Sequence, residues 1–501
     1  MGEKLEQLKQ HLYRYHDLEH ANALLEWDQQ VYMPEGGTEA RSEQMATLQA
    51  MAHEIFTSEE TGKLLESAEA EVAGMDFDGD EASLVRVLRR NYDKQTKIPT
   101  EIVADLARVT AQAYVAWRKA RTENDYTQFQ PHLQKVFDLN CKIAGILGYE
   151  EHPYDALLDL YEPGMKTSQV ESLFKDLRAG LVPLLRDITE RGKPVDDAFF
   201  TKAYPASRQS DLTLAILRDM GYDFERGRQD TTAHPFTTNF SCNDVRVTTR
   251  YLPHRPQSAI FSSIHEGGHA LYEQNIPEKF ERIALSGGAT YGLHESQSRM
   301  WENIVGRSRA FWKHYLPIMR AFFPEQLAGI DLERFYRAIN KVEPGFIRIE
   351  ADEVTYNLHI FVRFELEQAL ITGNLKVADV PDAWNAKYEE YLGITPETDA
   401  EGCMQDVHWA SGLIGYFPTY ALGNLISAQL YRRAKADIPG LEDGFAEGQL
   451  LPLLDWMRQH VHAHGAKFTA PEMLERELGE EISAQPLLDY MRARYTDVYG
   501  L

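Results

Sequence analysis

Apolar residues recur every three or four positions along most of the chain, which places them on one face of an α-helix. Between residues 4 and 30 this spacing joins Leu5, Leu8, Leu12, Tyr15, Leu18, Ala21 and Leu25. The same pattern predicts helices over residues 38–51, 83–97, 100–124, 131–147, 167–191, 208–220, 301–314, 332–341, 346–372, 421–433, 450–462, 470–479 and 484–499. The chain is therefore predicted to be mainly α-helical.

One stretch departs from the helical spacing. Residues 231–252 are rich in Thr, Val, Phe and Tyr, and Val245, Val247 and Thr249 stand at alternate positions. A period of two is typical of a strand with one buried face. We expect a small β-hairpin or meander there, with Asn243-Asp244 at its turn. A strand edge of this kind is able to hydrogen-bond an extended peptide.

The 501 residues contain no Ser/Gly-rich or Pro-rich linker and no repeat of fixed period. We therefore treat residues 1–501 as one domain. Its first part, residues 1–230, consists of amphipathic helices without obvious chemistry, which we expect to form a lobe that covers a cleft. Residues 231–501 hold the candidate chemistry and are expected to form the catalytic lobe.

The composition of the chain excludes some classes of binding partner. There are 77 Asp and Glu against 52 Lys and Arg, a formal net charge of −25. Nucleic-acid binding needs basic patches, so we expect no nucleic-acid partner. No apolar run approaches the ~20 residues of a membrane span, so we expect no membrane partner. Three scattered cysteines and a polar N-terminal stretch predict a cytoplasmic protein.

The strongest chemical signal is an H-E-x-x-H pattern at residues 265–269. On a helix, residues four apart share a face, so His265 and His269 present two imidazoles to one point. Such a pair is typical of a metal site. Glu266 stands beside them, where it is placed to act as a general base on a water molecule.

Two further features strengthen this interpretation. Gly267 and Gly268 occupy the x positions, and each glycine within a helix costs roughly 1 kcal/mol relative to alanine. Their presence predicts the close approach of another backbone. Glu295 follows His269 by 26 residues in a second polar segment. Because a catalytic zinc takes three protein ligands and one open position, Glu295 is the predicted third ligand.

Two later segments concentrate polar side chains. Arg348 and Asp352 are spaced i, i+4 in the helix predicted over residues 346–372, so a simple surface ion pair is one interpretation. Gln405 and His408 lie in a segment that also contains an acid and a tryptophan, and Tyr420 follows shortly after. A structural role for these residues is the alternative to a functional one.

Taken together, six segments resemble the Taq-type (thermostable) zinc metallocarboxypeptidase family of H-E-x-x-H peptidases, in order and in spacing over essentially the whole chain. They are residues 234–236 (HPF), 244–248 (DVRVT), 265–269 (HEGGH), 294–297 (HESQ), 347–352 (IRIEAD) and 402–409 (GCMQDVHW).

The resemblance implies a large two-lobed helical fold with a deep substrate groove, similar to neurolysin and angiotensin-converting enzyme. It also implies a homodimer, a Zn²⁺ ion that Co²⁺ can replace, and release of single residues from peptide C-termini with broad specificity. Its implied metal ligands are His265, His269 and Glu295, with Glu266 as general base.

The resemblance further implies roles for residues outside the metal site. Arg246 and Arg348 are implied anchors for the substrate carboxylate, and His408 and Tyr420 are implied donors to the tetrahedral intermediate. The remaining implied substrate-binding residues are His234, Asp352 and Gln405.

Two other functions compete with this one. The first is an oligopeptidase that cuts within short peptides. The second is a helical peptide-binding or scaffold protein with a structural metal. A structural zinc site is usually closed by four protein ligands that often include cysteine, and no cysteine lies within residues 265–295, so this alternative fits poorly.

Overall fold

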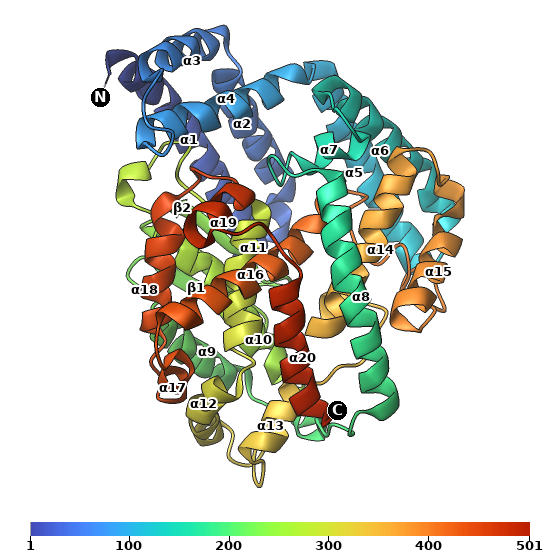
Figure 1. Cartoon of the computed structure of the whole chain (residues 1–501). Helices are drawn as coiled ribbons and strands as arrows, with labels where there is room; N and C mark the ends of the chain where they lie inside the picture. Colours follow the sequence, from blue (N-terminus) through green and yellow to red (C-terminus); the bar gives the residue numbers. More distant parts are fainter. Residues whose placement is uncertain (1) are drawn as a thin grey trace. The chain divides into compact units, whose positions relative to one another are not determined.

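The computed structural model describes residues 2–501, and α-helices make up most of it (Figure 1). The prediction of a mainly α-helical chain is confirmed. Contacts divide the chain into two compact units. Unit 1 consists of Met1–Thr96, Asp196–Ile339 and Leu430–Glu480, and unit 2 consists of Lys97–Val195, Asn340–Gln429 and Glu481–Leu501.

Unit 1 contains the helix that carries the H-E-x-x-H pattern. Its α-helices are α1 (Glu3–Val31), α2 (Thr38–Phe56), α3 (Glu59–Val72), α4 (Asp80–Lys97), α9 (Ala206–Met220), α10 (Pro256–Gln274), α11 (Tyr291–Arg299), α12 (Arg309–Phe322), α13 (Leu332–Ile339), α17 (Leu441–Ala446), α18 (Leu451–His460) and α19 (Ala470–Leu478). Short 3₁₀ turns cover Glu35–Gly37, Ala198–Thr201, Glu278–Phe280 and His462–His464, and a π-helical segment covers Met300–Val305.

Unit 2 is also helical. Its α-helices are α5 (Thr100–Glu123), α6 (Tyr126–Leu147), α7 (Pro153–Leu158), α8 (Thr167–Arg191), α14 (Glu353–Ile371), α15 (Val380–Leu392) and α20 (Gln485–Tyr499), with 3₁₀ turns at Arg348–Glu350 and Val377–Asp379. Helix α16 (Pro418–Asp437) begins in unit 2 and ends in unit 1.

A small sheet of three strands confirms the expected β structure in unit 1. The strands are β1 (Gly227–Thr231), β2 (Thr237–Ser241) and β3 (Asp244–Thr249), in the order β1-β3-β2. The β2–β3 pair is antiparallel, with Ser241 opposite Asp244, so the turn is Cys242-Asn243 and lies one residue before the predicted one. Strand β1 lies parallel to β3. Because the sequence of β1 is polar and shows no alternation of apolar residues, this strand is not predicted from the sequence.

The sheet supports α10. Val245 and Val247 of β3 are fully buried, and β3 and α10 are in contact. Most of α10 is buried as well, including Ile260, Ile264 and Leu271. Helix α10 is therefore held on several sides, which fixes the direction of the polar side chains that it carries.

Several helix boundaries differ from the predicted ones. The helix predicted to start near residue 346 begins only at Glu353, because the Asp352 carboxylate caps it by accepting from the amides of Val354 and Thr355. The helix predicted over residues 301–314 is replaced by the π-helical segment and by α12, whose first turn is capped by Ser308. Four helices lie where none is predicted: α3, α7, α15 and α17.

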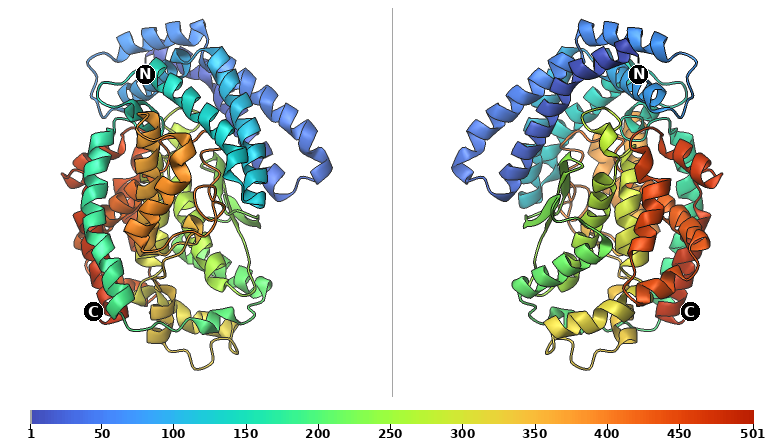
Figure 2. Two further views of the ribbon diagram at one scale, coloured as in Figure 1. Left: turned by 90° about the vertical axis from the view of Figure 1, so that its right-hand side faces the viewer. Right: turned by 90° about the vertical axis from the view of Figure 1, so that its left-hand side faces the viewer.

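The boundary between the two units does not lie at a single point near residue 230. Helix α9, which precedes that residue, packs on α10, and Leu217 and Met220 of α9 face Gly267. Helices α1 and α2 also belong to unit 1 and lie side by side (Figure 2). Unit 1 therefore contains helices from both sides of residue 230.

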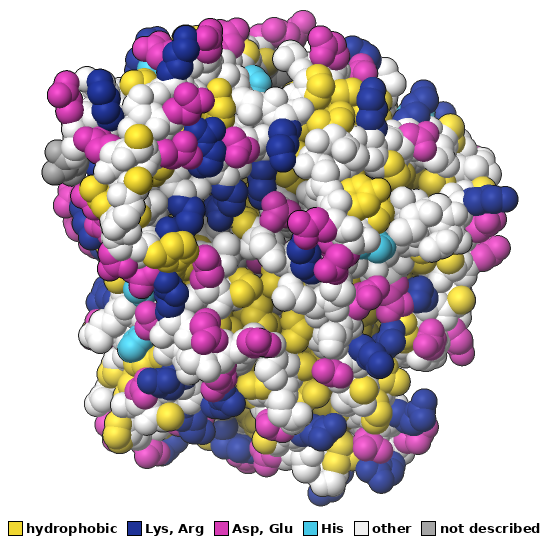
Figure 3. Space-filling model, turned by 45° about the horizontal axis from the view of Figure 1, so that its top comes forward, with side chains coloured by type: hydrophobic (Ala, Val, Ile, Leu, Met, Phe, Trp, Pro, Cys, Tyr) yellow, Lys and Arg dark blue, Asp and Glu magenta, His cyan; other side chains and the backbone are white. Residues whose placement is uncertain are grey.

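The surface carries both signs of charge. On the face shown in Figure 3, acidic and basic side chains occur beside one another, with apolar side chains between them. Within residues 2–501, no helix combines the length and apolar character needed to cross a membrane.

Candidate metal centre

Helices α10 and α11 bring His265, His269 and Glu295 together in unit 1. The Nε2 atom of His265 lies 3.8 Å from Glu295 Oε2, and the Nε2 atom of His269 lies 3.4 Å from the same oxygen. All three ligand atoms lie within 4.8 Å of one another. The i, i+4 pair and the distant glutamate thus form the cluster that the sequence predicts.

These distances fit a single divalent ion. Ligand atoms about 2.1 Å from a tetrahedral zinc are about 3.4 Å apart, close to the separations observed here. Two imidazoles and one carboxylate leave a fourth position open, as in catalytic zinc sites. The donor set is thus suited to a catalytic ion.

The glycine pair explains how α11 reaches α10. A Cβ atom on Gly268 would lie 2.7 Å from Ser298 Cα and 2.8 Å from Gln297 O, both in the backbone of α11. The predicted close approach of another backbone is therefore confirmed at Gly268. At Gly267 the neighbour is different, because a Cβ atom there would lie 2.5 Å from the side chain of Leu217.

Glu295 offers only one oxygen to the cluster. Arg299 donates from Nε to Glu295 Oε1 over 2.6 Å, so Oε2 is the oxygen that faces the two imidazoles. Burial alone would raise the pKa of Glu295, but the charge of Arg299, the interaction with His265 and the hydrogen bond with His269 hold it well below its usual value. Glu295 is therefore ionised, as a metal ligand must be.

The ring of His265 is oriented by a second glutamate. Its Nδ1 lies 2.9 Å from Glu302 Oε2, and Glu302 stands in the π-helical segment that continues α11. Burial alone would raise the pKa of Glu302, but the hydrogen bond with His265 and the nearby Arg299 and Arg307 lower it to about 2. A carboxylate that accepts from a ligand histidine fixes its ring and tautomer.

His269 has a different partner. Its Nδ1 lies 2.6 Å from His294 Nδ1, and His294 Nε2 lies 2.7 Å from Glu273 Oε1. The Asn239 amide of β2 donates to Glu273 Oε2 over 2.7 Å. Burial lowers the pKa of His269 to about 3, so its ring is neutral near pH 7 and able to bind a metal ion.

Glu266 lies beside the candidate ligands and is held by β2. The residue is only 6% exposed, and the Thr237 hydroxyl lies 2.7 Å from Oε2 and 2.9 Å from the Glu266 carbonyl oxygen. Burial raises the pKa of Glu266, and the Thr237 hydrogen bond opposes that shift. A carboxylate with a raised pKa is suited to accept and return a proton.

A second polar cluster lies within unit 2 around Asp406. Arg348 donates to both of its carboxylate oxygens, from Nη2 over 2.9 Å and from Nε over 3.0 Å. Arg363 also donates to Asp406, from Nε over 2.7 Å. The Gln405 side-chain oxygen accepts from the Arg348 amide and from Arg363 Nη2, each over 2.8 Å. Two arginines thus face one aspartate in a buried setting.

His408 and Tyr420 lie next to each other in the same unit. His408 Nε2 is 3.3 Å from the Tyr420 hydroxyl oxygen, and the Arg348 guanidinium lies 5.1 Å from the centre of the Tyr420 ring. Among the described residues, His408 Nδ1 has no hydrogen-bond partner. Burial, together with the charges of Arg348 and Arg363, lowers the pKa of His408 to about 3. His408 is therefore neutral near pH 7.

The remaining predicted residues occupy less distinctive positions. Arg246 of β3 pairs with Asp244 over two contacts of 2.8 Å, and its guanidinium lies 4.3 Å from the centre of the Trp27 ring. His234 is exposed in the loop between β1 and β2. Asp352 does not pair with Arg348; its carboxylate caps α14 instead.

Several residues that support these clusters are not predicted from the sequence. They are Thr237, Asn239, Glu273, His294, Arg299, Glu302 and Arg363. A signal exists for two of them, because Arg299 and Glu302 follow Glu295 at i+4 and i+7 and share its helical face. Arg363 and Asp406 are 43 residues apart, and nothing in the local pattern links them.

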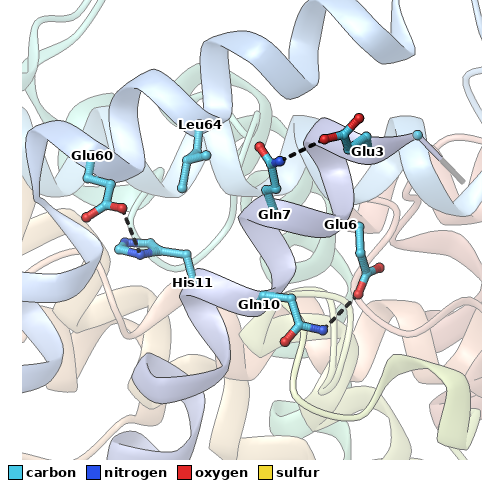
Figure 4. A pocket seen from close by; sticks show the side chains of 8 residues that line it. Glu3, Glu6, Gln7, Gln10, His11, Glu60 and Leu64 are labelled. Carbon is cyan, nitrogen blue, oxygen red and sulfur yellow. Dashed lines mark hydrogen bonds and ion pairs between the residues drawn. The ribbon is translucent and has the colours of Figure 1, made fainter.

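A surface pocket at the start of α1 is lined by polar side chains that already have partners (Figure 4). Gln7 donates to Glu3, Gln10 donates to Glu6, and His11 lies near Glu60. The described lining therefore shows no arrangement that would support chemistry.

Comparisons with known proteins agree with the metal chemistry. The family model described as carboxypeptidase Taq (M32) metallopeptidase matches residues 7–495. The chain is 40% identical over 481 residues to carboxypeptidase 1 of Bacillus subtilis, with 96% of each chain covered. It is 43% identical over 488 residues to thermostable carboxypeptidase 1 of Thermus thermophilus, with 95% of each chain covered.

Solved structures include close relatives. The M32 carboxypeptidase from Deinococcus radiodurans R1 is similar with a TM-score of 0.97 at 42% identity, and the match covers 100% of both chains. These matches show that the chain belongs to the carboxypeptidase Taq (M32) family of metallopeptidases and is a peptide hydrolase.

Proposed function

We propose that this chain is a zinc-dependent carboxypeptidase that releases single residues from peptide C-termini with broad specificity. The observation that carries the proposal is the convergence of His265, His269 and Glu295 beside Glu266, in a chain of the carboxypeptidase Taq family. Zinc suits two imidazoles and one carboxylate, and cobalt is expected to replace it. When bound, such an ion polarises a carbonyl group and lowers the pKa of water.

Glu266 is the proposed general base. It accepts a proton from the attacking water and later returns that proton to the leaving amine. The Thr237 hydrogen bond supports this role, because it restricts the Glu266 carboxylate to one orientation. His265 and His269 are the proposed ligands on either side, so the base stands next to the reacting water.

Arg348 is the proposed anchor for the terminal carboxylate of the substrate. Its cluster contains two guanidinium groups and one carboxylate, so Arg348, Arg363 and Asp406 together carry one excess positive charge. The excess positive charge favours the binding of an anion. A planar guanidinium group binds a carboxylate through paired hydrogen bonds. Arg246 is the weaker candidate, because Asp244 neutralises it.

The other residues in the proposal support the same task. His408 and Tyr420 are proposed donors to the oxyanion, and a neutral His408 is able to donate a hydrogen bond. Gln405 and Asp352 are proposed to hold the Arg348 segment, since Gln405 accepts from the Arg348 amide and Asp352 caps the helix that follows. His234, which is exposed, remains a proposed substrate contact.

Mass spectrometry of one digested peptide tests the proposal. We expect a ladder of products, each shorter by one C-terminal residue, and we expect no products after treatment with a chelator. An internal cut would favour the oligopeptidase. Unchanged activity in metal-stripped protein would overturn the metal mechanism.

We further propose that the enzyme is a homodimer in the cytoplasm, on the basis of the family resemblance and the few cysteines. Sedimentation equilibrium tests the first point: a mass twice that of one 57.3 kDa chain is expected. A mass of one chain would contradict it. The test of the second point is fractionation of the source cells.

A further inference from the structure

Three hydrogen bonds in unit 1 link a proposed metal ligand to the β-sheet. His269 Nδ1 lies 2.6 Å from His294 Nδ1, His294 Nε2 lies 2.7 Å from Glu273 Oε1, and Asn239 donates to Glu273 Oε2 over 2.7 Å. The chain of hydrogen bonds therefore runs from α10 to α11, back to α10 and on to β2. No part of it touches the substrate in the proposed mechanism.

The acceptors in this chain of hydrogen bonds determine where the protons lie. Carboxylate oxygens accept hydrogen bonds, and Asn239 already donates to Oε2 of Glu273, so the contact at Oε1 places a hydrogen on His294 Nε2. In the tautomer with its hydrogen on Nε2, the His294 ring accepts at Nδ1, and His269 Nδ1 is the donor. The remaining nitrogen of His269, Nε2, is left with a free lone pair. This is the atom that lies 3.4 Å from Glu295 Oε2.

The ring of His294 is itself held in place. A Cβ atom on Gly288 would lie 2.5 Å from His294 Cδ2, so that glycine backbone lies directly against the ring. The Tyr272 ring is centred 5.2 Å from the His294 ring. These two neighbours limit rotation of the ring, so the hydrogen bond to His269 is directional.

The two proposed histidine ligands are therefore supported differently. His265 meets the Glu302 carboxylate directly, whereas His269 meets the His294 imidazole, which stands between it and Glu273. His294 also directly precedes Glu295, so one dipeptide of α11 supplies both a ligand and the partner of another ligand.

We propose that His294 is a positioning residue for the metal site: backed by Glu273 and Asn239, it fixes His269 in the tautomer whose Nε2 binds the ion. The proposal rests on the metal site of the proposed function. His294 makes no contact with the ion, and its effect is on affinity through the orientation of His269. Partners of this kind typically contribute about 10- to 100-fold to metal affinity.

Two substitutions at one position separate this role from a merely structural one. In His294→Asn, the amide oxygen stands the same number of bonds from Cβ as Nδ1 does, so it still accepts from His269. In His294→Leu that acceptor is lost. We expect the Zn²⁺ dissociation constant, measured by competition with a chromophoric chelator, to rise about 10- to 100-fold in His294→Leu and to stay within about threefold of wild type in His294→Asn.

A double-mutant cycle tests whether the residues act as one chain of hydrogen bonds. Glu273→Leu should also weaken zinc binding, because His294 then loses the acceptor that fixes its tautomer. The double variant His294→Leu/Glu273→Leu should bind zinc within about threefold of His294→Leu alone. If His294→Leu does not fold, as judged by circular dichroism, Glu273→Leu alone carries the test.

The outcomes distinguish this proposal from the one on which it rests. If the wild-type protein binds no zinc, the proposed function fails. If the wild type binds zinc and His294→Leu or Glu273→Leu binds it equally tightly, the positioning role of His294 is overturned. Equal weakening in His294→Asn and His294→Leu would also overturn it, because the loss would then come from packing and not from the hydrogen bond.

Discussion

Gly268 lies so close to Ser298 that a Cβ atom on the glycine would be 2.7 Å from the serine Cα. The backbones of α10 and α11 are therefore in contact at this point. His269 and Glu295 flank the contact on the two helices, one residue and three residues away in sequence. The distance between two proposed metal ligands thus depends on the absence of a side chain at Gly268.

Gly268→Ala should weaken the metal site, and Gly267→Ala is its matched control. Both substitutions gain up to ~1 kcal/mol of helix propensity. At Gly268 the new Cβ meets backbone, which forces α11 away at a cost of about 1–3 kcal/mol. At Gly267 it meets the flexible end of Leu217, so the neighbour is able to move. Thermal unfolding and zinc titration should show lower stability and weaker binding for Gly268→Ala than for Gly267→Ala. Equal behaviour would show that the helix contact does not set the ligand distance.

Thr237→Val should lower turnover while leaving metal content unchanged. Valine keeps the shape of threonine but lacks the hydroxyl group that lies 2.7 Å from Glu266 Oε2. Losing a hydrogen bond to a charged group costs about 1.5–3 kcal/mol, so we expect kcat to fall about tenfold or more. Thr237→Ser keeps the hydroxyl group and should retain most of the activity. Metal analysis of both variants completes the test, and a loss of metal from Thr237→Val would assign Thr237 to the metal site instead.

Arg348→Ala should discriminate between peptides by their C-terminal group. Losing a buried partner of a carboxylate costs about 2–5 kcal/mol, so kcat/KM on peptides with a free carboxylate should fall ~30-fold or more. A peptide amidated at its C-terminus lacks that charge, so it should be a poor substrate for the wild type and suffer little further loss. Arg246→Ala should show a smaller effect, because Asp244 already pairs with Arg246. Equal losses of Arg348→Ala on both peptides would mean that Arg348 only supports Asp406.

Glu367 should make stability depend on pH. This fully buried residue of α14 accepts from Tyr154, Trp409 and the Gly415 amide. Burial outweighs these donors and raises its pKa from 4.5 to about 7. The folded chain therefore holds a proton on Glu367 more tightly than the unfolded chain does. The resulting stabilisation is complete below pH 4.5 and is lost as the pH rises through about 7.

The comparison of wild type with Glu367→Gln isolates this effect. The variant keeps the shape of the side chain and cannot titrate. Between pH 5 and pH 8, the free energy of unfolding of the wild type should fall by roughly 2–3 kcal/mol more than that of the variant. Denaturant unfolding at the two pH values measures the difference. Parallel pH profiles would mean that Glu367 is ionised throughout.

Local spacing explains why the two histidines of the proposed metal site could be predicted from the sequence. His265 and His269 are one helical turn apart, so their convergence needs only the helix. The glycine pair also predicts a close helix contact, because its cost in helix propensity calls for compensation. Most helices follow from the same apolar periodicity, as in α8, whose predicted and observed ranges agree.

Long-range pairs could not be predicted in this way. The spacing of Arg348 and Asp352 suggests an ion pair on one helix, but Asp352 caps that helix and Arg348 stands before it. The actual partner of Arg348 is Asp406, 58 residues later, and Arg363 reaches the same carboxylate from α14. Such contacts depend on how elements pack, and no periodicity within the sequence records them.

Metal content and turnover measured on one preparation of Glu266→Gln test the central claim most directly. Glutamine keeps the size of Glu266 and cannot act as a base, so about one zinc ion per chain should remain while turnover falls at least ~100-fold. His265→Ala and Glu295→Ala should instead lose the ion. Near-normal turnover in Glu266→Gln, or loss of its zinc, would contradict the assignment of Glu266 as the general base beside the metal ligands.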